Sequence, residues 1–437
     1  MFCKGDKTSV MLMLRAFQTF SEASGLKMNG SKSNIYCNGV DDGVIRLVEE
    51  ATGMKCGGIP FRYLGVCISP KRLGISDCER LVDKVTARIT LLGSKKLSYA
   101  GRLVLIKAVY STLHNYWARI FILPKNVLNR IDAICRKFLW HGNDSKESPP
   151  LVAWDTICQP KRLGGLGLKK LHLWNIAALG KYVWWIEKKS DHLWVKWVHA
   201  IYIKDKNWME FVPSASASWS WRKICWVKDM LKPWLAGCSS YSVKLGYSWL
   251  CTGGTEVPWH CCMRNRFLIP KHSFFCWLIA HQHLLTQDRL MQMRITQRNY
   301  CFLCADAAEN HSHLFFLCIF SRKCLFLVFV WFQTILPDRD VFVWFQTILP
   351  DRDVFEWWIN CRMKTLMAKK VIVIGLASLM YHIWWSRNQC RLEGFVNSPE
   401  NVFKKVQDDV RSRINICIAA CKSWKAKEWI HLLLARD

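Results

Sequence analysis

The stretch CFLCADAAENHSHLFFLC, residues 301–318, places three cysteines and two histidines within eighteen positions. Thiolate sulfur and imidazole nitrogen are preferred ligands of Zn²⁺, and the C-x2-C spacing of Cys301 and Cys304 is typical of the first half of a structural zinc site. Four such ligands close a tetrahedral site and leave no open position for catalysis. The pattern therefore predicts a structural zinc ion in preference to a group of buried free thiols.

The second pair of ligands has three candidates, which are His311, His313 and Cys318. On a regular helix, His311 and Cys318 are seven residues apart and nearly eclipsed, whereas His313 and Cys318 are five apart and about 140° apart around the axis. A fully helical segment 311–318 therefore favours His311. A helix that begins near His313 leaves His313 within reach, so spacing alone keeps both histidines open.

The charge of the chain indicates a polyanionic partner. It contains 62 Lys and Arg against 33 Asp and Glu, which gives a formal net charge of +29 spread along the whole sequence. A field of this sign favours phosphate backbones, so we expect RNA or DNA as partner and no small-molecule substrate. The 24 Trp residues fit either a large core or stacking on bases.

The same composition bears on compartment. The 21 Cys are scattered through a long chain, and the N-terminal apolar run is interrupted by charges, which is unlike a secretory leader. We therefore expect reduced thiols in the nucleus or cytoplasm and no secretion. The two most apolar stretches, residues 324–337 and 371–385, are shorter than the roughly 20 residues that span a bilayer, so no membrane partner is expected.

Periodicity predicts a mainly α-helical chain with a small α+β segment at its N-terminal end. Apolar spacing predicts helices at 8–24 and 41–53, a strand within 61–69, and three helices at 77–92, 97–117 and 124–140. Ser76 and Glu79 have the spacing of a capping box in front of the first of these three. Their exposed sides supply the candidate nucleic-acid contacts Lys95, Lys96, Arg102, Lys107, Arg119, Lys125, Arg130, Arg136 and Lys137.

The second half of the chain has three further features. PSASASWS is typical of a linker, and residues 356–437 predict a mainly helical tail. The segment VFVWFQTILPDRD at 328–340 recurs without change at 341–353. Two copies of thirteen residues are too few and too short for a solenoid, so we interpret the repeat as a recent duplication or an assembly error and assign it no function.

Several motifs together resemble one family. FSEASGLKMNGSKS, FRYLGVCIS, KKLSYAGRLVLIKAVYSTLHNYW, FLWHG, CQPKRLGGLGLKKL, YSVKLGYSWL and IPKHSFFCWLIAHQHLLTQDRL occur in the order found in the C-terminal half of a plant LINE-type (non-LTR) retrotransposon reverse transcriptase. The resemblance covers roughly residues 1–330, with a weaker match in IWWSRNQCRLEGF.

The resemblance implies a layout. Residues 1–75 would be a remnant of the polymerase palm, 76–210 a thumb-like basic helical region, 211–240 a linker and 241–330 the reverse transcriptase zinc-binding domain, with the duplicated segment and helical tail at 331–437. The family pattern HLFF-x-C selects the second pair of zinc ligands. The implied set, in the order C-x2-C-x8-H-x4-C, is Cys301, Cys304, His313 and Cys318.

Catalytic carboxylates are not expected in this chain. The polymerase of this family uses an aromatic-Ala-Asp-Asp hairpin that precedes the segment resembling FCKGDKTS, where this chain starts. Asp41 and Asp42 follow that region and fit a helix N-terminus instead. The expected function is that of a truncated, non-enzymatic reverse transcriptase that binds zinc and nucleic acid. The alternatives are a fragment of an active RNA-directed DNA polymerase and a non-functional pseudogene product.

Overall fold

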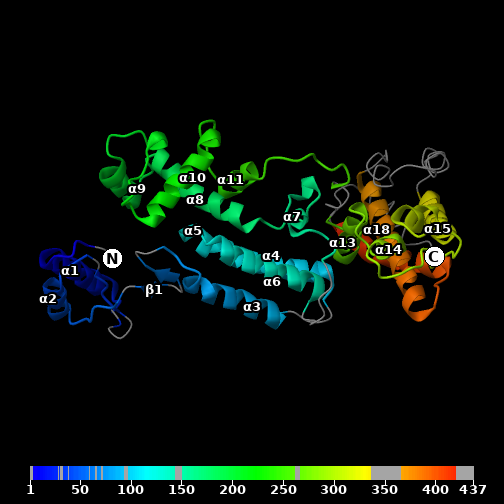
Figure 1. Cartoon of the computed structure of the whole chain (residues 1–437), viewed down its shortest axis with the longest axis horizontal. Coiled ribbons are helices and arrows are strands. Elements are labelled where there is room, and N and C mark those ends of the chain that lie inside the picture. The colour runs from blue at the N-terminus through cyan, green and yellow to red at the C-terminus, as the bar shows by residue number, and fades with distance from the viewer. Residues whose placement is uncertain are drawn as a thin grey trace. The chain divides into compact units, whose positions relative to one another are not determined.

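The computed structural model of the chain describes residues 3–27, 29, 33–37, 39–58, 60–63, 66–69, 72–92, 97–142, 150–260, 266–335 and 366–419 (Figure 1). These residues are mainly helical, with one short strand pair, which confirms the predicted fold class. They form two compact units. The first unit comprises Met1–Asp83, His114–Leu128 and Asn175–Gly246, and the second comprises Lys84–Leu113, Asn129–Trp174 and Tyr247–Asp437.

Local sequence signals place the first elements where they were predicted. Helices α1 (Lys7–Ser24) and α2 (Asp42–Thr52) begin after aspartate caps, and Asp41 accepts a hydrogen bond from the amide of Gly43 at 3.0 Å. Asp41 therefore caps a helix, as expected. The prediction of a single strand within 61–69 is wrong. Instead, β1 (Phe61–Tyr63) and β2 (Val66–Ile68) form an antiparallel pair, and two residues are enough to connect such strands.

The three basic helices also follow their predicted ranges as α3 (Glu79–Leu92), α4 (Tyr99–Asn115) and α6 (Lys125–His141). The predicted capping box is wrong. Ser76 lies inside a 3₁₀ turn, η2 (Ser76–Cys78), and Asp77 instead accepts a hydrogen bond from the amide of Gly74 at 2.8 Å. Between α4 and α6, the hydroxyl of Tyr110 donates to the carboxylate of Asp132.

Residues 211–240, predicted to be a linker, contain the helix α10 (Trp219–Leu235). Ser218 caps it by accepting from the amide of Trp221, and Lys228 is buried with its ammonium donating to the carbonyl of Phe211 at 2.7 Å. The linker-like composition is thus confined to the residues just before α10. The remaining helices of this region are α5 (Trp117–Ile120), α7 (Trp154–Ile157), α8 (Leu171–Glu187), α9 (Leu193–Val198) and α11 (Val243–Leu250).

In the second unit, the glycine-rich segment QPKRLGGLGLKKL is held by side chains from two helices. The carbonyl of Gly164 accepts hydrogen bonds from Trp277 Nε1 at 2.7 Å and His281 Nε2 at 2.8 Å, at the end of α13 (Pro270–Ala280). Lys107 of α4 donates to the carbonyl of Leu166 at 3.2 Å. Gly165 has no room for a side chain, since a Cβ would lie 2.0 Å from the carbonyl oxygen of Gln159.

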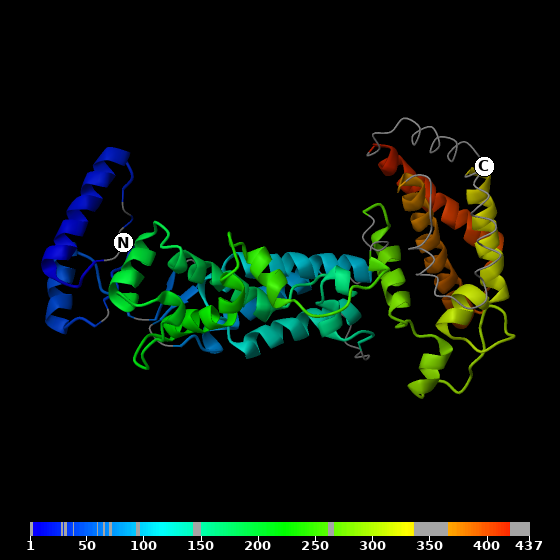
Figure 2. The ribbon, with the colours of Figure 1, turned by 90° about the horizontal axis from the view of Figure 1, so that it is seen from above.

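The helical tail is confirmed where the structure describes it. Helices α15 (Ile319–Ile335), α18 (Leu366–Glu393) and α19 (Pro399–Ala419) pack together, with α18 and α19 side by side (Figure 2). Val402, Val406 and Val410 recur every fourth residue on α19 and are fully buried. The second copy of the repeat, 341–353, lies outside the described residues. Within the described part, no helix is both long and apolar enough to cross a membrane.

Candidate metal centre and nucleic-acid interface

Cys301 and Cys304 lie in a tight turn that begins the candidate metal centre. The amide of Ala305 donates to the carbonyl of Cys301 at 2.8 Å, and the amide of Cys301 donates to the carbonyl of Ala307 at 2.8 Å. Ala305 adopts a left-handed conformation with φ of 57°, which is uncommon for a residue with a Cβ. These contacts fold the C-x2-C segment back on itself, so both thiols face the same side.

A π-helical turn brings His313 and Cys318 together. In η6 (His313–Leu317), the amide of Cys318 donates to the carbonyl of His313 at 2.7 Å, an i→i+5 bond. Asn310 caps the turn by accepting from the amide of His313 at 2.7 Å. A spacing of five residues is unfavourable on an α-helix but closes one turn of a π-helix, so the objection to His313 from helical geometry disappears.

The four predicted ligands converge. Their ligand atoms all lie within 4.8 Å of one another. Cys301 Sγ is 3.9 Å from Cys318 Sγ, and Cys304 Sγ is 3.3 Å from His313 Nε2. Tetrahedral zinc with ordinary bond lengths separates two sulfurs by about 3.8 Å, and a sulfur and a nitrogen by about 3.6 Å. The geometry therefore fits a structural zinc ion held by what we call the cysteine cluster: Cys301, Cys304, His313 and Cys318.

His311, the alternative ligand, is engaged elsewhere. Its Nε2 accepts a hydrogen bond from the amide of Leu284 at 3.2 Å, and its Nδ1 lies 3.4 Å from the hydroxyl of Thr286. Burial lowers the pKa of His311 to about 4, so the ring is neutral and can accept the amide proton. His311 thus supports the chain that leads into α14 (Gln287–Gln292).

Electrostatics prepares the cysteine cluster for a cation. A hydrogen bond from the thiol of Cys301, together with the amides of Phe320 and Ser321 at the start of α15, lowers the pKa of Cys318 below that of an ordinary thiol. The same hydrogen bond and burial raise the pKa of Cys301. The shift at Cys318 favours the thiolate, which is the form that binds metal.

A buried ion pair anchors the loop between the two halves of the cysteine cluster, and sequence reasoning missed it. Arg387 of α18 donates to both carboxylate oxygens of Glu309, the shortest contact being Nη2 to Oε1 at 2.6 Å. Both side chains are almost completely buried, and Glu309 also accepts from the amide of Gln287 at 3.0 Å. The sequence feature that could have indicated this ion pair is Arg387 in IWWSRNQC, because it is an arginine within an apolar helix.

The predicted nucleic-acid contacts are in different environments. Arg102 donates from Nη1 to the carbonyls of Leu139 and Trp140, at 3.2 and 3.3 Å. Burial and the charge of Lys161 lower the pKa of Lys107 to about 8. Lys95 and Lys96 lie outside the described residues. The exposed members of the set are Arg119, Lys125, Arg130, Arg136 and Lys137.

A basic stripe on α3 was not singled out from the sequence. Arg80, Lys84 and Arg88 are exposed and recur every fourth residue, so they share one face of the helix. The opposite face is apolar and buried, with Leu81, Val82, Val85 and Ile89 in the core. Helical periodicity could have identified this stripe, because the apolar positions fix which side faces solvent.

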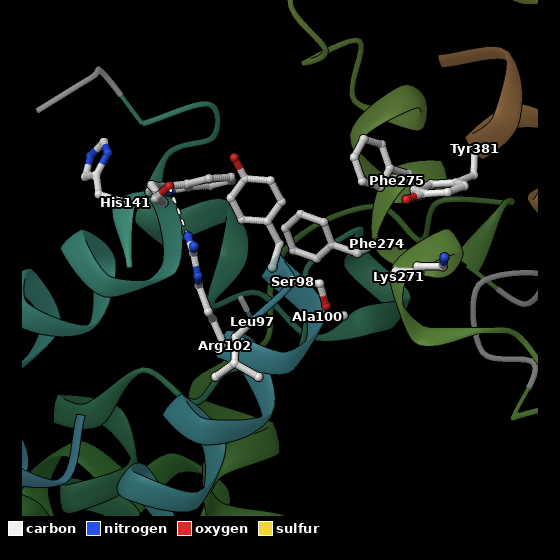
Figure 3. Close-up of a pocket in the computed structure, with 11 residues that line it drawn as sticks. Leu97, Ser98, Ala100, Arg102, His141, Lys271, Phe274, Phe275 and Tyr381 are labelled. Atoms are coloured by element: carbon white, nitrogen blue, oxygen red, sulfur yellow. Dashed lines mark hydrogen bonds between the residues drawn. The ribbon is translucent and has the colours of Figure 1, made fainter. Parts of the chain in front are cut away.

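A hollow of ≈ 470 Å³ in the second unit combines aromatic rings with cations (Figure 3). Tyr99 and Phe274 stack there with ring centroids 5.4 Å apart. Arg102 from α4 and Lys271 from α13 line the same hollow. Two buried N–H donors on its wall, Arg102 Nε and Trp140 Nε1, have no acceptor within the described part of the chain. The hollow thus offers aromatic side chains and positive charge, and the two unpaired donors lie buried in its wall.

Comparisons with known proteins agree with the cysteine cluster. Residues 241–324 match the family model described as zinc-binding in reverse transcriptase. A protein of Arabidopsis thaliana named as a ribonuclease H protein is 34% identical over 158 residues, which are 35% of this chain and 25% of that relative. The chain therefore spans about a quarter of the length of the curated relative it matches. The two matches support a retrotransposon-derived protein that contains a zinc-binding domain of the reverse transcriptase type.

Proposed function

We propose that this chain is a nucleic-acid-binding part of a LINE-type retrotransposon reverse transcriptase, in which a structural zinc ion shapes the binding module. The hollow lined by Tyr99, Arg102, Lys271 and Phe274 is the observation that carries the proposal. Aromatic faces stack on unpaired bases of any sequence, and neighbouring cations contact phosphate. The net charge of +29 and the basic stripe on α3 supply the longer-range attraction.

Zinc has a structural role in this proposal. Three thiolates and one imidazole complete its coordination, so no position remains for a substrate. Cys318, at the start of α15, and the C-x2-C turn would be cross-linked by the ion. The binding surface then depends on zinc only through the shape of the module.

No polymerase chemistry is assigned to these residues. The sequence contains no aromatic-Ala-Asp-Asp motif, and the carboxylate of Asp41 caps α2 by accepting from the amide of Gly43. A second candidate is that the chain works as one portion of an active RNA-directed DNA polymerase, which the partial coverage of the relative favours. Primer extension on an RNA template by the chain alone would contradict the proposal that the chain binds nucleic acid without catalysing polymerisation.

A salt titration of RNA and DNA binding tests the proposal. Filter binding of single-stranded and duplex probes should give an affinity that falls steeply with salt, because phosphate contacts release counterions. Replacing Arg80, Lys84 and Arg88 together by Gln should lower the salt slope by about 2 to 3 if each contacts one phosphate. The matched control is Lys196→Gln, an exposed cation paired with Asp191 at 2.6 Å.

Two outcomes would contradict the proposal. One is affinity for neither probe at low salt, and the other is affinity that does not change with salt. A Lys271→Gln variant then locates the contact, since it removes a cation from the hollow and leaves the aromatic rings in place. Its affinity for single strands should fall more than its affinity for duplex, because stacking requires unpaired bases.

A further inference from the structure

A second group of ligand side chains lies where α13, α18 and α19 meet. It consists of His272, His382 and Asp409, which we call the histidine cluster, and its three ligand atoms lie within 4.8 Å of one another. His382 Nε2 is 2.9 Å and His272 Nε2 is 3.7 Å from the same oxygen, Asp409 Oδ2. The cluster shares no residue with the cysteine cluster.

Two ring nitrogens of the histidine cluster, His272 Nε2 and His382 Nδ1, are buried without a hydrogen-bond partner among the described residues, and His272 Nε2 is the one that faces Asp409. The side chain of His272 is 1% exposed, and its Nε2 has no donor or acceptor in hydrogen-bonding range among the described residues. The 3.7 Å to Asp409 is too long for a hydrogen bond. A buried polar atom is normally paired, so an orphaned imidazole nitrogen aimed at a carboxylate needs an explanation.

The distances between the ligand atoms suit a bound metal ion. Zinc bonds of about 2.0 to 2.2 Å to nitrogen and oxygen, arranged tetrahedrally, separate neighbouring ligand atoms by about 3.3 Å. The observed 2.9 and 3.7 Å lie on either side of that value, so shifts of less than half an ångström would satisfy both pairs.

The surroundings hold the ligands in place. Ser378 Oγ donates to Asp409 Oδ2 at 2.6 Å, and the ring of Tyr381 stacks on His272 with centroids 4.5 Å apart. Such outer contacts typically orient metal ligands.

We propose that the histidine cluster is a second metal site, which takes a divalent first-row transition metal ion such as Zn²⁺ through two imidazole nitrogens and one carboxylate oxygen. A fourth position remains for water, because the cluster supplies three ligands. His382 and Asp409 keep 12% and 22% of their side-chain surface exposed, which provides an entry path. The ion would cross-link α13 of the zinc-binding domain to the two C-terminal helices.

Metal content of the full chain tests this site. After loading with Zn²⁺ and removal of free ion, the wild type should retain two equivalents and His272→Phe one. Phenylalanine keeps a ring against Tyr381, and His272 Nε2 has no hydrogen bond to lose, so the variant is expected to fold. Asp409→Asn is the second variant, since an amide oxygen still accepts from Ser378 but binds metal weakly.

Loading with Co²⁺ separates the two sites by their ligands. Thiolate coordination gives an intense sulfur-to-cobalt charge-transfer band, whereas two imidazoles and a carboxylate give only weak ligand-field bands. His272→Phe and Asp409→Asn should keep the charge-transfer band and lose one equivalent of cobalt. Saturation of the wild type at one equivalent, or two equivalents retained by both variants, would overturn the proposal.

Discussion

The two ligand clusters of the second unit differ in how the chain assembles them. The cysteine cluster takes its ligands from residues 301–318, and a turn and a π-helical turn bring them together. The histidine cluster takes one ligand from each of three helices, at positions 272, 382 and 409. Backbone geometry over a few residues can form the first, whereas only tertiary packing can form the second. The difference predicts which cluster depends on which part of the fold.

Removing the cysteine cluster should have the largest effect. Structural zinc contributes roughly 10–16 kcal/mol in isolated zinc-finger peptides, and the Glu309–Arg387 pair keeps part of this loop in place without metal. We therefore expect Cys301→Ser to lower the free energy of unfolding by about 5 kcal/mol. Denaturant unfolding of zinc-loaded protein measures the loss, and amide exchange should rise across residues 301–318 before it rises in α18 and α19.

The control for this change is Cys324→Ala. Cys324 is a fully buried thiol in α15, six residues beyond Cys318, and it is not a ligand of the cluster. Its replacement should cost about 1 kcal/mol and leave the zinc content unchanged. Equal losses of stability and metal in both variants would show that the cysteine cluster is no different from an ordinary buried thiol.

Breaking the buried ion pair should have the next largest effect. Arg387→Met leaves the Glu309 carboxylate buried without its partner, so we expect a loss of about 3–5 kcal/mol in unfolding experiments. Arg391→Met, an exposed arginine one turn later, should change stability by less than about 0.5 kcal/mol. The double variant Arg387→Met, Glu309→Met should recover much of the loss, because no uncompensated charge remains.

This prediction also tests how local the cysteine cluster is. Its ligands are close in sequence, but the loop that joins them is held by α18, which lies far along the chain. If Arg387→Met weakens zinc binding as well as stability, the cluster depends on tertiary structure despite its compact spacing. Unchanged zinc affinity would mean that local backbone geometry is sufficient to form the cysteine cluster, in contrast to the histidine cluster.

The same contrast explains what the sequence could predict. Local patterns identified the helices α3, α4 and α6, the cap at Asp41, and the residues of the cysteine cluster, because each depends on spacing within a few turns. The strand pair was predicted as one strand, since composition does not show where a short strand reverses. Choosing His313 over His311 needed the family pattern, because a π-helical turn leaves no trace in periodicity.

Features that depend on the packing of distant segments could not be predicted from local sequence patterns. The hollow takes its walls from α4, α6, α13 and α18, and the Glu309–Arg387 pair and the histidine cluster also join distant segments. Nothing in the spacing of His272, His382 and Asp409 indicates that they meet. Of the predicted cations, Arg102 and Lys107 make backbone contacts across the fold, which helical periodicity alone cannot show.

The pH dependence of the free energy of unfolding should show the smallest effect. It distinguishes His311, which lies next to the cysteine cluster in the sequence, from His272 of the histidine cluster. Burial lowers the pKa of His311 to about 4 and that of His272 to about 3, whereas unfolded histidine titrates near 6.5. Between these values the unfolded state binds more protons than the folded state, so stability falls as the pH drops from about 6.5 towards 4. Above pH 6.5 this contribution is constant.

His311→Gln and His272→Phe each remove one of the two titrations. An interval of about 2.5 pKa units corresponds to at most about 3.4 kcal/mol for His311, and the measured slope of unfolding free energy between pH 4 and 6.5 should decrease in each variant. The cysteine ligands titrate identically in both, so the difference from wild type isolates the histidine. In the metal-loaded protein the His272→Phe difference should grow, because protons then compete with the ion for His272. A His272→Phe difference that stays the same with and without metal would mean that the histidine cluster only packs three helices together.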